Sequence, residues 1–197
     1  MGTDAPLLGE PLPVELMNTL FADRDGVHDA LRDRDGVTAW LHAVHHRTDH
    51  SSAPGEPTAA DHDRLVALRD ALRRLAAEVT EDPRPAAADP HGLHAAVSVL
   101  NETAADTPRW SALSWTPEPS RHTRTAGRAV AAVVSAIAED AIALFGGDGR
   151  HRLRACLGPG CVLYFLKDHP RREWCSAGCG NRARSARHYR RHRGTTT

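Results

Sequence analysis

Cysteine is absent from the first 155 residues of this 197-residue chain, although four cysteines follow. A disulfide framework would be spread through a small secreted domain, so this distribution favours a reducing compartment. No secretory signal is visible, because Met1–Leu8 is short, acidic and contains proline. We therefore expect the protein to be cytoplasmic.

Other missing features narrow the class of function. The most apolar run, Ala129–Ala138, is too short to cross a bilayer, so we expect no membrane partner. The sequence shows no internal repeat, no phosphate-binding glycine loop, no nucleophile elbow and no supported set of Ser, His and Asp. For want of a recognisable catalytic set, we expect that the protein is not an enzyme, and we assign no catalytic residue.

The four cysteines that are present have the spacing of a structural zinc site. Cys156 and Cys161 are spaced C-x4-C, Cys175 and Cys179 are spaced C-x3-C, and thirteen residues separate the two pairs. Zinc takes four thiolates in a tetrahedron at about 2.3 Å, and two short chelating loops close that shell without leaving a position for water. The turn residues Gly158–Gly160 allow the first loop to bend tightly. We predict that these cysteines bind one structural Zn²⁺.

The residues around the second pair predict a small zinc finger. Val162–Trp174 carries β-forming residues on both sides of Asp168–Pro170, which indicates two short strands and a turn. From Asn181 to His192 the composition and periodicity are helical. A knuckle, a hairpin and a helix that begins at the last ligand form a treble-clef-like order. Cys179 then lies at a helix N-terminus, where the helix dipole favours its thiolate form.

These residues carry a resemblance to a known family. The string Cys179–Arg182, preceded by Trp174-Cys175, resembles the CGNR zinc finger family, whose members are described as candidate bacterial transcription regulators with an N-terminal ABATE domain. Gly9–Leu12 and Glu15–Leu20 are similar to the opening of that domain, and Val37–Leu41 is similar to its next helix. The resemblance implies a regulator with one zinc ion.

The first part of the chain is predicted to be helical. Apolar residues recur at helical spacing over five segments: Leu12–Leu20, Asp35–Val44, Thr58–Val79, Pro90–Leu100 and Thr125–Phe145. We expect Asp35 to cap the second helix, and Thr58 to form a capping box with Asp61 at the third. Alternation over Arg109–Thr116 predicts a hairpin with His122–Thr125.

We therefore expect a mainly α fold with a small β-hairpin, an α+β class. A helical ABATE-like domain would occupy residues 1–147 and a CGNR zinc finger residues 150–193, with Gly146–Gly149 as a hinge between them. Buried core is the favoured position for Trp40, Trp110 and Trp115. The alternative is that these three line a ligand pocket in the first domain.

Charge separates the two parts. The 25 Lys and Arg balance 25 Asp and Glu, but the residues from Arg150 onward hold twelve basic and two acidic side chains. The tail therefore carries +10 and the preceding residues carry −10, and the tail keeps about +8 after the formal −2 of a zinc tetrathiolate. A positive patch of this size is typical of a surface that binds a polyanion.

The predicted tail helix carries most of this charge. Its six arginines are Arg182, Arg184, Arg187, Arg190, Arg191 and Arg193. These guanidinium groups repel one another unless a negative partner is near, and their planar forks suit phosphate oxygens or the edge of guanine. We predict that they contact DNA. For Asn181 and Arg182, support of the zinc-binding loop and contact with DNA are both open, and Asn181 is assigned the supporting role.

Two functions remain open from the sequence. The first is a zinc-binding transcription regulator that binds DNA through its tail, with the first domain sensing a small effector, dimerising or contacting another protein. RNA is a variant of this reading, because attraction to phosphate does not distinguish the two nucleic acids. The second is a zinc-stabilised protein-interaction module attached to a ligand-binding helical domain. In that case the basic helix would dock on a protein partner or on the acidic first domain.

Overall fold

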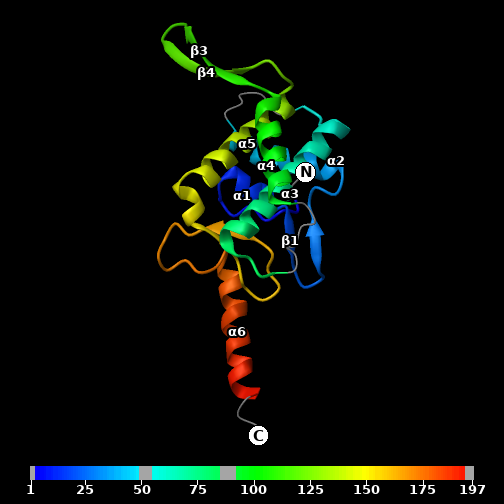
Figure 1. Cartoon of the computed structure of the whole chain (residues 1–197), viewed down its shortest axis with the longest axis vertical. Coiled ribbons are helices and arrows are strands. Elements are labelled where there is room, and N and C mark those ends of the chain that lie inside the picture. Colours follow the sequence, from blue (N-terminus) through cyan, green and yellow to red (C-terminus); the bar gives the residue numbers. More distant parts are fainter. Residues whose placement is uncertain (1–2, 49–54, 85–91, 194–197) are drawn as a thin grey trace.

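A computed structural model describes residues 3–48, 55–84 and 92–193, with the side chains of the last helix placed as far as Arg191. Helices make up 53% of the structure, and the described strands form three separate antiparallel pairs. The predicted mainly α fold with small hairpins is therefore confirmed (Figure 1).

The elements follow one another in this order: α1 (Leu12–Met17), β1 (Leu20–Ala22), β2 (Val27–Asp29), α2 (Arg34–Val44), η1 (His45–Arg47), α3 (Ala59–Thr80), α4 (Leu93–Asp106), β3 (Arg109–Trp115), β4 (Pro119–Thr125), α5 (Ala129–Gly146), η3 (Asp148–His151), β5 (Leu153–Ala155), β6 (Tyr164–Leu166) and α6 (Ala177–Arg193). The pairs are β1 with β2, β3 with β4, and β5 with β6. The predicted start of the fourth helix at Pro90 lies outside the described residues.

Two helix starts show how local chemistry sets the boundaries. The predicted capping box of α3 is present, because Asp61 N donates to Thr58 Oγ1 at 3.2 Å and Thr58 N donates to Asp61 Oδ2 at 2.8 Å. The prediction that Asp35 caps α2 is wrong. Asp33 has the extended backbone that a cap requires, and its Oδ1 accepts a hydrogen bond from Gly36 N at 2.8 Å.

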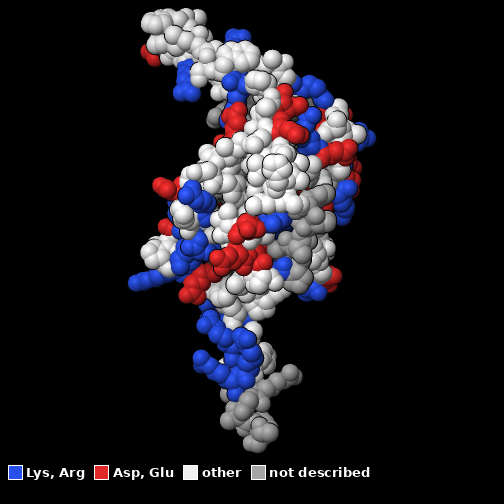
Figure 2. All heavy atoms as spheres, in the orientation of Figure 1, with Lys and Arg blue, Asp and Glu red and all other residues white. Residues whose placement is uncertain are grey.

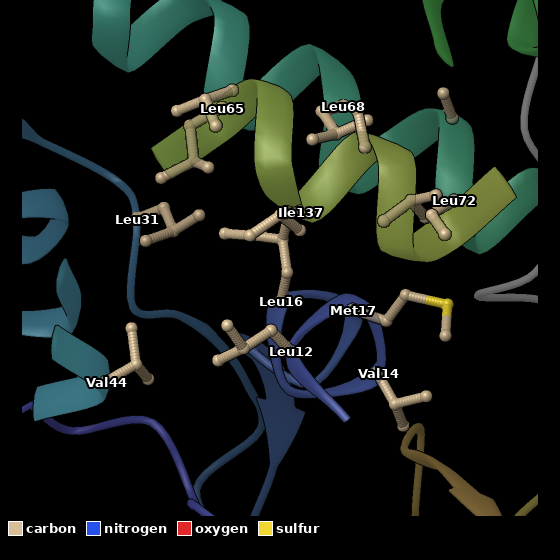
Figure 3. Packing of buried hydrophobic residues seen from close by; sticks show 14 of the residues in the cluster. Leu12, Val14, Leu16, Met17, Leu31, Val44, Leu65, Leu68, Leu72 and Ile137 are labelled. Atoms are coloured by element: carbon tan, nitrogen blue, oxygen red, sulfur yellow. The ribbon is translucent and has the colours of Figure 1, made fainter. Parts of the chain in front are cut away.

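The core lies where α1 packs against α3 and α5, which also contact each other. Every residue of the short α1 is buried. Figure 3 shows Leu16 and Met17 of α1 beside Ile137 of α5, with leucines of α3 above them. Removal of these side chains from water supplies the main driving force for folding, at about 1.5–3 kcal/mol for each fully buried large side chain. Trp40 of α2 is fully buried, as expected.

Helix α5 is the long apolar helix predicted as the spine of the first domain. Among the described helices it alone is long and apolar enough to cross a membrane, because apolar residues continue past Ala129–Ala138 to Gly146. The expectation that the apolar segment at Ala129–Ala138 is too short to cross a bilayer is therefore corrected. Length and composition are weak evidence for a span, however, since the core helix of a soluble protein passes the same test. Half of this helix is buried, and Val133, Ile137 and Ala141 pack in the core.

The small hairpin of the tail lies elsewhere than predicted. Its strands are β5 and β6, which flank the first cysteine pair, with Leu153 opposite Leu166 and Ala155 opposite Tyr164. The expected strand pair within Val162–Trp174 is wrong, because β6 pairs backwards to the segment before Cys156. The physical reason is burial: Leu153, Tyr164 and Leu166 belong to the same core as α1 and α3.

The segment expected to be a hinge forms a hydrogen-bonded corner. Arg150 Nη1 donates to the carbonyl oxygens of Gly146 and Gly147 at 3.1 and 2.7 Å, and η3 follows directly. The zinc-finger residues and the helical part therefore share a core and a braced connection. The division of the chain into domains at residues 1–147 and 150–193 stays a prediction.

A second hairpin, β3 with β4, has the predicted position but projects from the body (Figure 1). Its side chains do not enter the core. Trp110 and Trp115 are 50% and 70% exposed, so the expectation that they are buried is wrong, and neither lines a pocket described in the structure. The hairpin leaves both of its faces uncovered, and therefore gives these indoles nothing to pack against.

Candidate metal centre and basic helix

The four cysteine sulfurs come together at one point. All four Sγ atoms lie within 4.8 Å of one another, and all four residues are buried. The Sγ atoms of Cys161 and Cys175 are 3.8 Å apart, and those of Cys175 and Cys179 are 3.4 Å apart. Thiolates bound tetrahedrally at about 2.3 Å from zinc are about 3.8 Å from one another. The set is therefore positioned to bind one metal ion and fits a structural Zn²⁺.

The first pair is held by a tight backbone knuckle. Cys156 N donates to the carbonyl oxygen of Leu163 at 2.9 Å, and Cys161 N donates to that of Gly158, also at 2.9 Å. A Cβ atom on Gly158 would lie 3.1 Å from Cys179 Cβ and 3.4 Å from its Sγ, so a side chain there would push this metal-binding cysteine out of place. Gly160 has a φ of +72°, a conformation that other residues rarely adopt.

The second pair is placed by the start of α6. Ser176 Oγ accepts a hydrogen bond from Cys179 N at 3.3 Å, which is the capping pattern, so Cys179 lies in the first turn as predicted. Arg182 Nη2 donates to Cys179 Sγ at 3.0 Å. Asn181, to which the sequence assigned this support, is exposed and accepts a hydrogen bond from Arg184. In the structure the neighbour of the sulfur is therefore Arg182.

The close approach of the sulfur atoms changes the pKa values of Cys156, Cys161 and Cys175. Hydrogen bonds from Cys161 and Cys175 lower the pKa of Cys156 to about 2. The hydrogen bond to Cys156 raises the pKa of Cys161 to about 12, and hydrogen bonds with Cys156 and Cys161 raise the pKa of Cys175. Cys156 therefore loses its proton most readily, while Cys161 and Cys175 keep their protons and donate them in hydrogen bonds to its sulfur. A divalent ion displaces those protons, because its own charge stabilises four thiolates together.

The helical part holds the first knuckle through a half-buried arginine, Arg84. Arg84 Nη1 lies 3.1, 3.1 and 3.2 Å from the carbonyl oxygens of Cys156, Cys161 and Leu163. Asp82 fixes the guanidinium group, with Oδ2 2.6 Å from Arg84 Nη2, and also accepts a hydrogen bond from the Tyr164 hydroxyl at 2.7 Å. The knuckle therefore takes its shape partly from residues that precede it by about 70 positions.

A second link reaches the other cysteine pair. Glu10 Oε2 accepts a hydrogen bond from Leu166 N at 2.9 Å, and Glu10 Oε1 pairs with Arg172 Nη2 at 2.5 Å. Arg172 Nη2 also lies 3.3 Å from the carbonyl oxygen of Cys175. Burial raises the pKa of Glu10 above its ordinary value, against the opposing effects of Leu166 N and Arg172. Both loops of the metal site are thus tied to the helical part.

Sequence reasoning did not identify these supporting residues. Glu10 and Asn18 fall within the segments that resemble the ABATE opening, and both are almost fully buried. The sequence did offer a signal for these two residues, because both lie beside the apolar residues of Leu12–Met17. A polar residue that is buried with such neighbours needs a hydrogen-bond partner elsewhere in the fold. Nothing in the local pattern distinguishes Arg84 from a surface arginine of the loop that contains it.

The basic helix extends away from the body. Arg182, Arg184, Arg187, Arg190 and Arg191 are exposed, and the side chain of Arg193 lies outside the described residues. Ala183 is 6% exposed and Ala186 is half-buried, so the small residues of this helix are less exposed than its arginines. Figures 1 and 2 show α6 projecting from the end of the molecule opposite the β3–β4 hairpin, with a dense cluster of positive side chains on its surface.

The fold and the site define a metal-binding protein in which a helical domain carries a four-cysteine zinc finger. Residues 10–148 match ABATE, described as "Putative stress-induced transcription regulator", and residues 152–192 match the CGNR zinc finger. The chain belongs to the ABATE family, since that match covers more than half of its length. The two matches support a zinc-binding protein of the regulator class and suggest a soluble protein. No curated protein matches the chain.

Proposed function

We propose that this protein is a transcription regulator that binds DNA through α6 and the zinc finger. The observation that carries the proposal is the placement of α6: a helix with no acidic residue, anchored in its first turn at the metal site, extends from the body with its arginines exposed. The six predicted contacts are Arg182, Arg184, Arg187, Arg190, Arg191 and Arg193. Phosphate groups supply the negative charge that such a helix lacks.

The zinc ion has a structural role in this proposal. Four sulfur atoms fill its tetrahedral shell, so no position is open for a water molecule or a substrate. We therefore propose that the protein is not an enzyme and acts in the cytoplasm, where thiols remain reduced. The metal holds the start of α6 in place. Arg84 and Glu10 link the two loops of the metal site to the helical domain, so they also relate the orientation of α6 to that domain. A small effector or a protein bound to the helical domain would act through these links.

The alternative of a protein-interaction module has less support. Docking of α6 on the acidic first domain would cover the arginines, whereas the helix leaves the body and keeps them exposed (Figure 1). A separate protein partner would need an acidic groove of matching length. RNA remains a variant of the proposal, since the arginines neutralise its phosphates equally well.

The test compares two sets of three alanine substitutions. Arg184→Ala, Arg187→Ala and Arg191→Ala remove charge from α6, and Arg24→Ala, Arg32→Ala and Arg34→Ala remove the same charge from exposed positions of the body. With zinc content unchanged, we expect the α6 set to lose retention of duplex DNA and the body set to keep it. Equal retention by both sets would reject the proposal and favour a protein partner. Duplex RNA and single-stranded RNA serve as parallel probes of the variant.

A further inference from the structure

The β3–β4 hairpin with its turn, residues 109–125, forms an arm that is anchored at its base and uncovered beyond it. Arg109 Nε lies 2.7 Å from Glu139 Oε2, and Arg128 Nη1, just after the arm, lies 3.0 Å from Asp61 Oδ2. From Ser114 to Arg124 every residue is exposed. A two-stranded hairpin is at best marginally stable in water on its own. The arm therefore has the form of an element that is completed by contact with another surface.

The two faces of the arm differ in character. Strand register puts Leu113 and Trp115 on one face, opposite Arg121 and Pro119, and puts Trp110 on the other face. Leu113 and Trp115 are the more exposed, at 69% and 70%. Arg121 is held on their face, because its Nε donates to Ser111 Oγ at 3.1 Å. This face offers a large apolar anchor with the positive charge of Arg121 beside it.

A groove of complementary character lies between α3 and α4. Its volume is about 400 Å³, and its floor is built largely from small or branched apolar residues, including Val66, Ala67 and Val99. Alanine side chains leave the space that larger residues would fill. Asp63 and Asp70 lie at its margin with side chains 80% and 45% exposed. Cavities of about 300–1,000 Å³ with apolar walls and a few polar groups hold ligands of drug size, so an indole and an isobutyl group fit.

We propose that the arm of one copy of this chain docks in the α3–α4 groove of a second copy, and that the exchange is reciprocal. Leu113 and Trp115 would occupy the apolar floor, and Arg121 would approach Asp63 and Asp70 of the second copy. The occupant is a second copy because this chain carries both complementary surfaces. The arm is apolar with a positive charge, and the groove is apolar with negative charges. Reciprocal exchange about a twofold axis closes the assembly at a dimer.

The dimer is independent of the proposed DNA binding. The arm and α6 lie at opposite ends of the molecule (Figure 1), so docking of the arm leaves the basic helix uncovered. If both proposals hold, the assembly presents two such helices related by a twofold axis, which suits a DNA site with two half-sites.

The test is the mass of the full zinc-loaded chain over a concentration series, measured by sedimentation equilibrium. We expect a monomer–dimer equilibrium in the wild type. The pair Leu113→Ser and Trp115→Ser and the pair Asp63→Arg and Asp70→Arg should each weaken dimerisation, by about 30-fold or more for each anchor residue lost. Trp110→Ser is the matched control, since this tryptophan lies on the opposite face of the same arm, and it should leave the dimer intact.

Mixing supplies the decisive result. The arm variant keeps an intact groove and the groove variant keeps an intact arm, so an equimolar mixture should form a heterodimer although neither variant forms a homodimer. Far-ultraviolet circular dichroism and zinc content establish that each variant is folded. The proposal is overturned by a wild type that stays monomeric throughout, by a dimer that ignores both pairs of substitutions, or by a dimer that depends on the arm alone.

Discussion

Asn18 and Tyr164 exchange two hydrogen bonds of 2.9 Å: Asn18 Nδ2 donates to the carbonyl oxygen of Tyr164, and Tyr164 N donates to Asn18 Oδ1. The side-chain amide thus replaces a neighbouring strand along the free edge of β6. Asn18 is fully buried at the end of α1. One residue of the helical part therefore completes the hairpin that carries the first cysteine pair.

Loss of this pair should cost stability. In Asn18→Ala the N–H and carbonyl groups of Tyr164 stay buried without their partner, and each such group costs about 1–3 kcal/mol. We expect the free energy of unfolding to fall by about 2–4 kcal/mol in urea titrations of the zinc-loaded protein. Asn101→Ala removes an exposed amide from α4 and should change it by less than about 0.5 kcal/mol. Similar losses for the two variants would contradict the bridging role of Asn18.

Arg84 should control the affinity of the metal site without touching the metal. Arg84→Met removes the donor shared by three knuckle carbonyls, and it takes the ion pair away from the buried Asp82 carboxylate, which keeps its hydrogen bond from Tyr164. Loss of a group that orients metal ligands typically weakens metal binding by about 10–100-fold. Competition with a chromophoric chelator measures the change. Arg74→Met, which breaks only a surface pair with Glu78, is the control; the role assigned to Arg84 fails if both variants keep wild-type zinc affinity.

Removal of one ligand should disorder α6 more than the hairpin. Cys175→Ser opens the metal shell, and α6 then loses the anchor at its first turn, since a basic helix of this length is marginal alone. Tyr164 and Leu166 keep their partners Asn18 and Glu10. Hydrogen exchange should show lost protection in α6 with retained protection in β6 and α3. Stoichiometric zinc in the variant would contradict the assignment of Cys175 as a ligand.

Asp61 should make a pH-dependent contribution at the start of α3. Burial acts to raise its pKa, but hydrogen bonds from Thr58 outweigh that effect and hold the pKa below 3.8. A lowered folded-state pKa means that the stabilisation is present above pH 3.8 and is lost as the pH falls through the folded-state value. At neutral pH the free energy of unfolding of the wild type should be about 1 kcal/mol higher than that of Asp61→Asn.

The measurement for Asp61 is the difference in unfolding free energy between wild type and Asp61→Asn as a function of pH. The difference should shrink as the pH falls below 3.8. Both proteins hold zinc at the same site, so effects of acid on the metal cancel in the comparison. A gap between wild type and Asp61→Asn that is constant or widens in acid would contradict the capping account.

Local signals allowed the cysteine cluster and most helices to be predicted. The spacing within each cysteine pair reflects the size of one ion, and the capping box of Thr58 and Asp61 lies within four residues. Both features therefore depend on residues that are close together in the sequence. The pairing of β5 with β6 could not be found in this way. It depends on burial of Leu153 and Tyr164 against α1 and α3, which are distant in the sequence.

The roles of polar residues whose partners are distant in the sequence were also difficult to predict from local patterns. Arg84 looks like a surface residue until the fold places three backbone carbonyl groups beside it. The opposite error occurred at Trp110 and Trp115. Their size favours burial on average, but the hairpin that carries them has no layer against either face. In both cases tertiary context overrode a sound local expectation.

The central claim is that zinc positions α6 to bind nucleic acid, and fluorescence anisotropy tests it most directly. Zinc-loaded wild type and Cys175→Ser are titrated against labelled mixed-sequence duplex DNA at several salt concentrations. The account predicts that wild type binds, that the logarithm of its affinity falls with the logarithm of salt concentration by about 0.9 for each phosphate neutralised, and that Cys175→Ser binds weakly. Absence of binding, insensitivity to salt, or equal binding by the variant would contradict it.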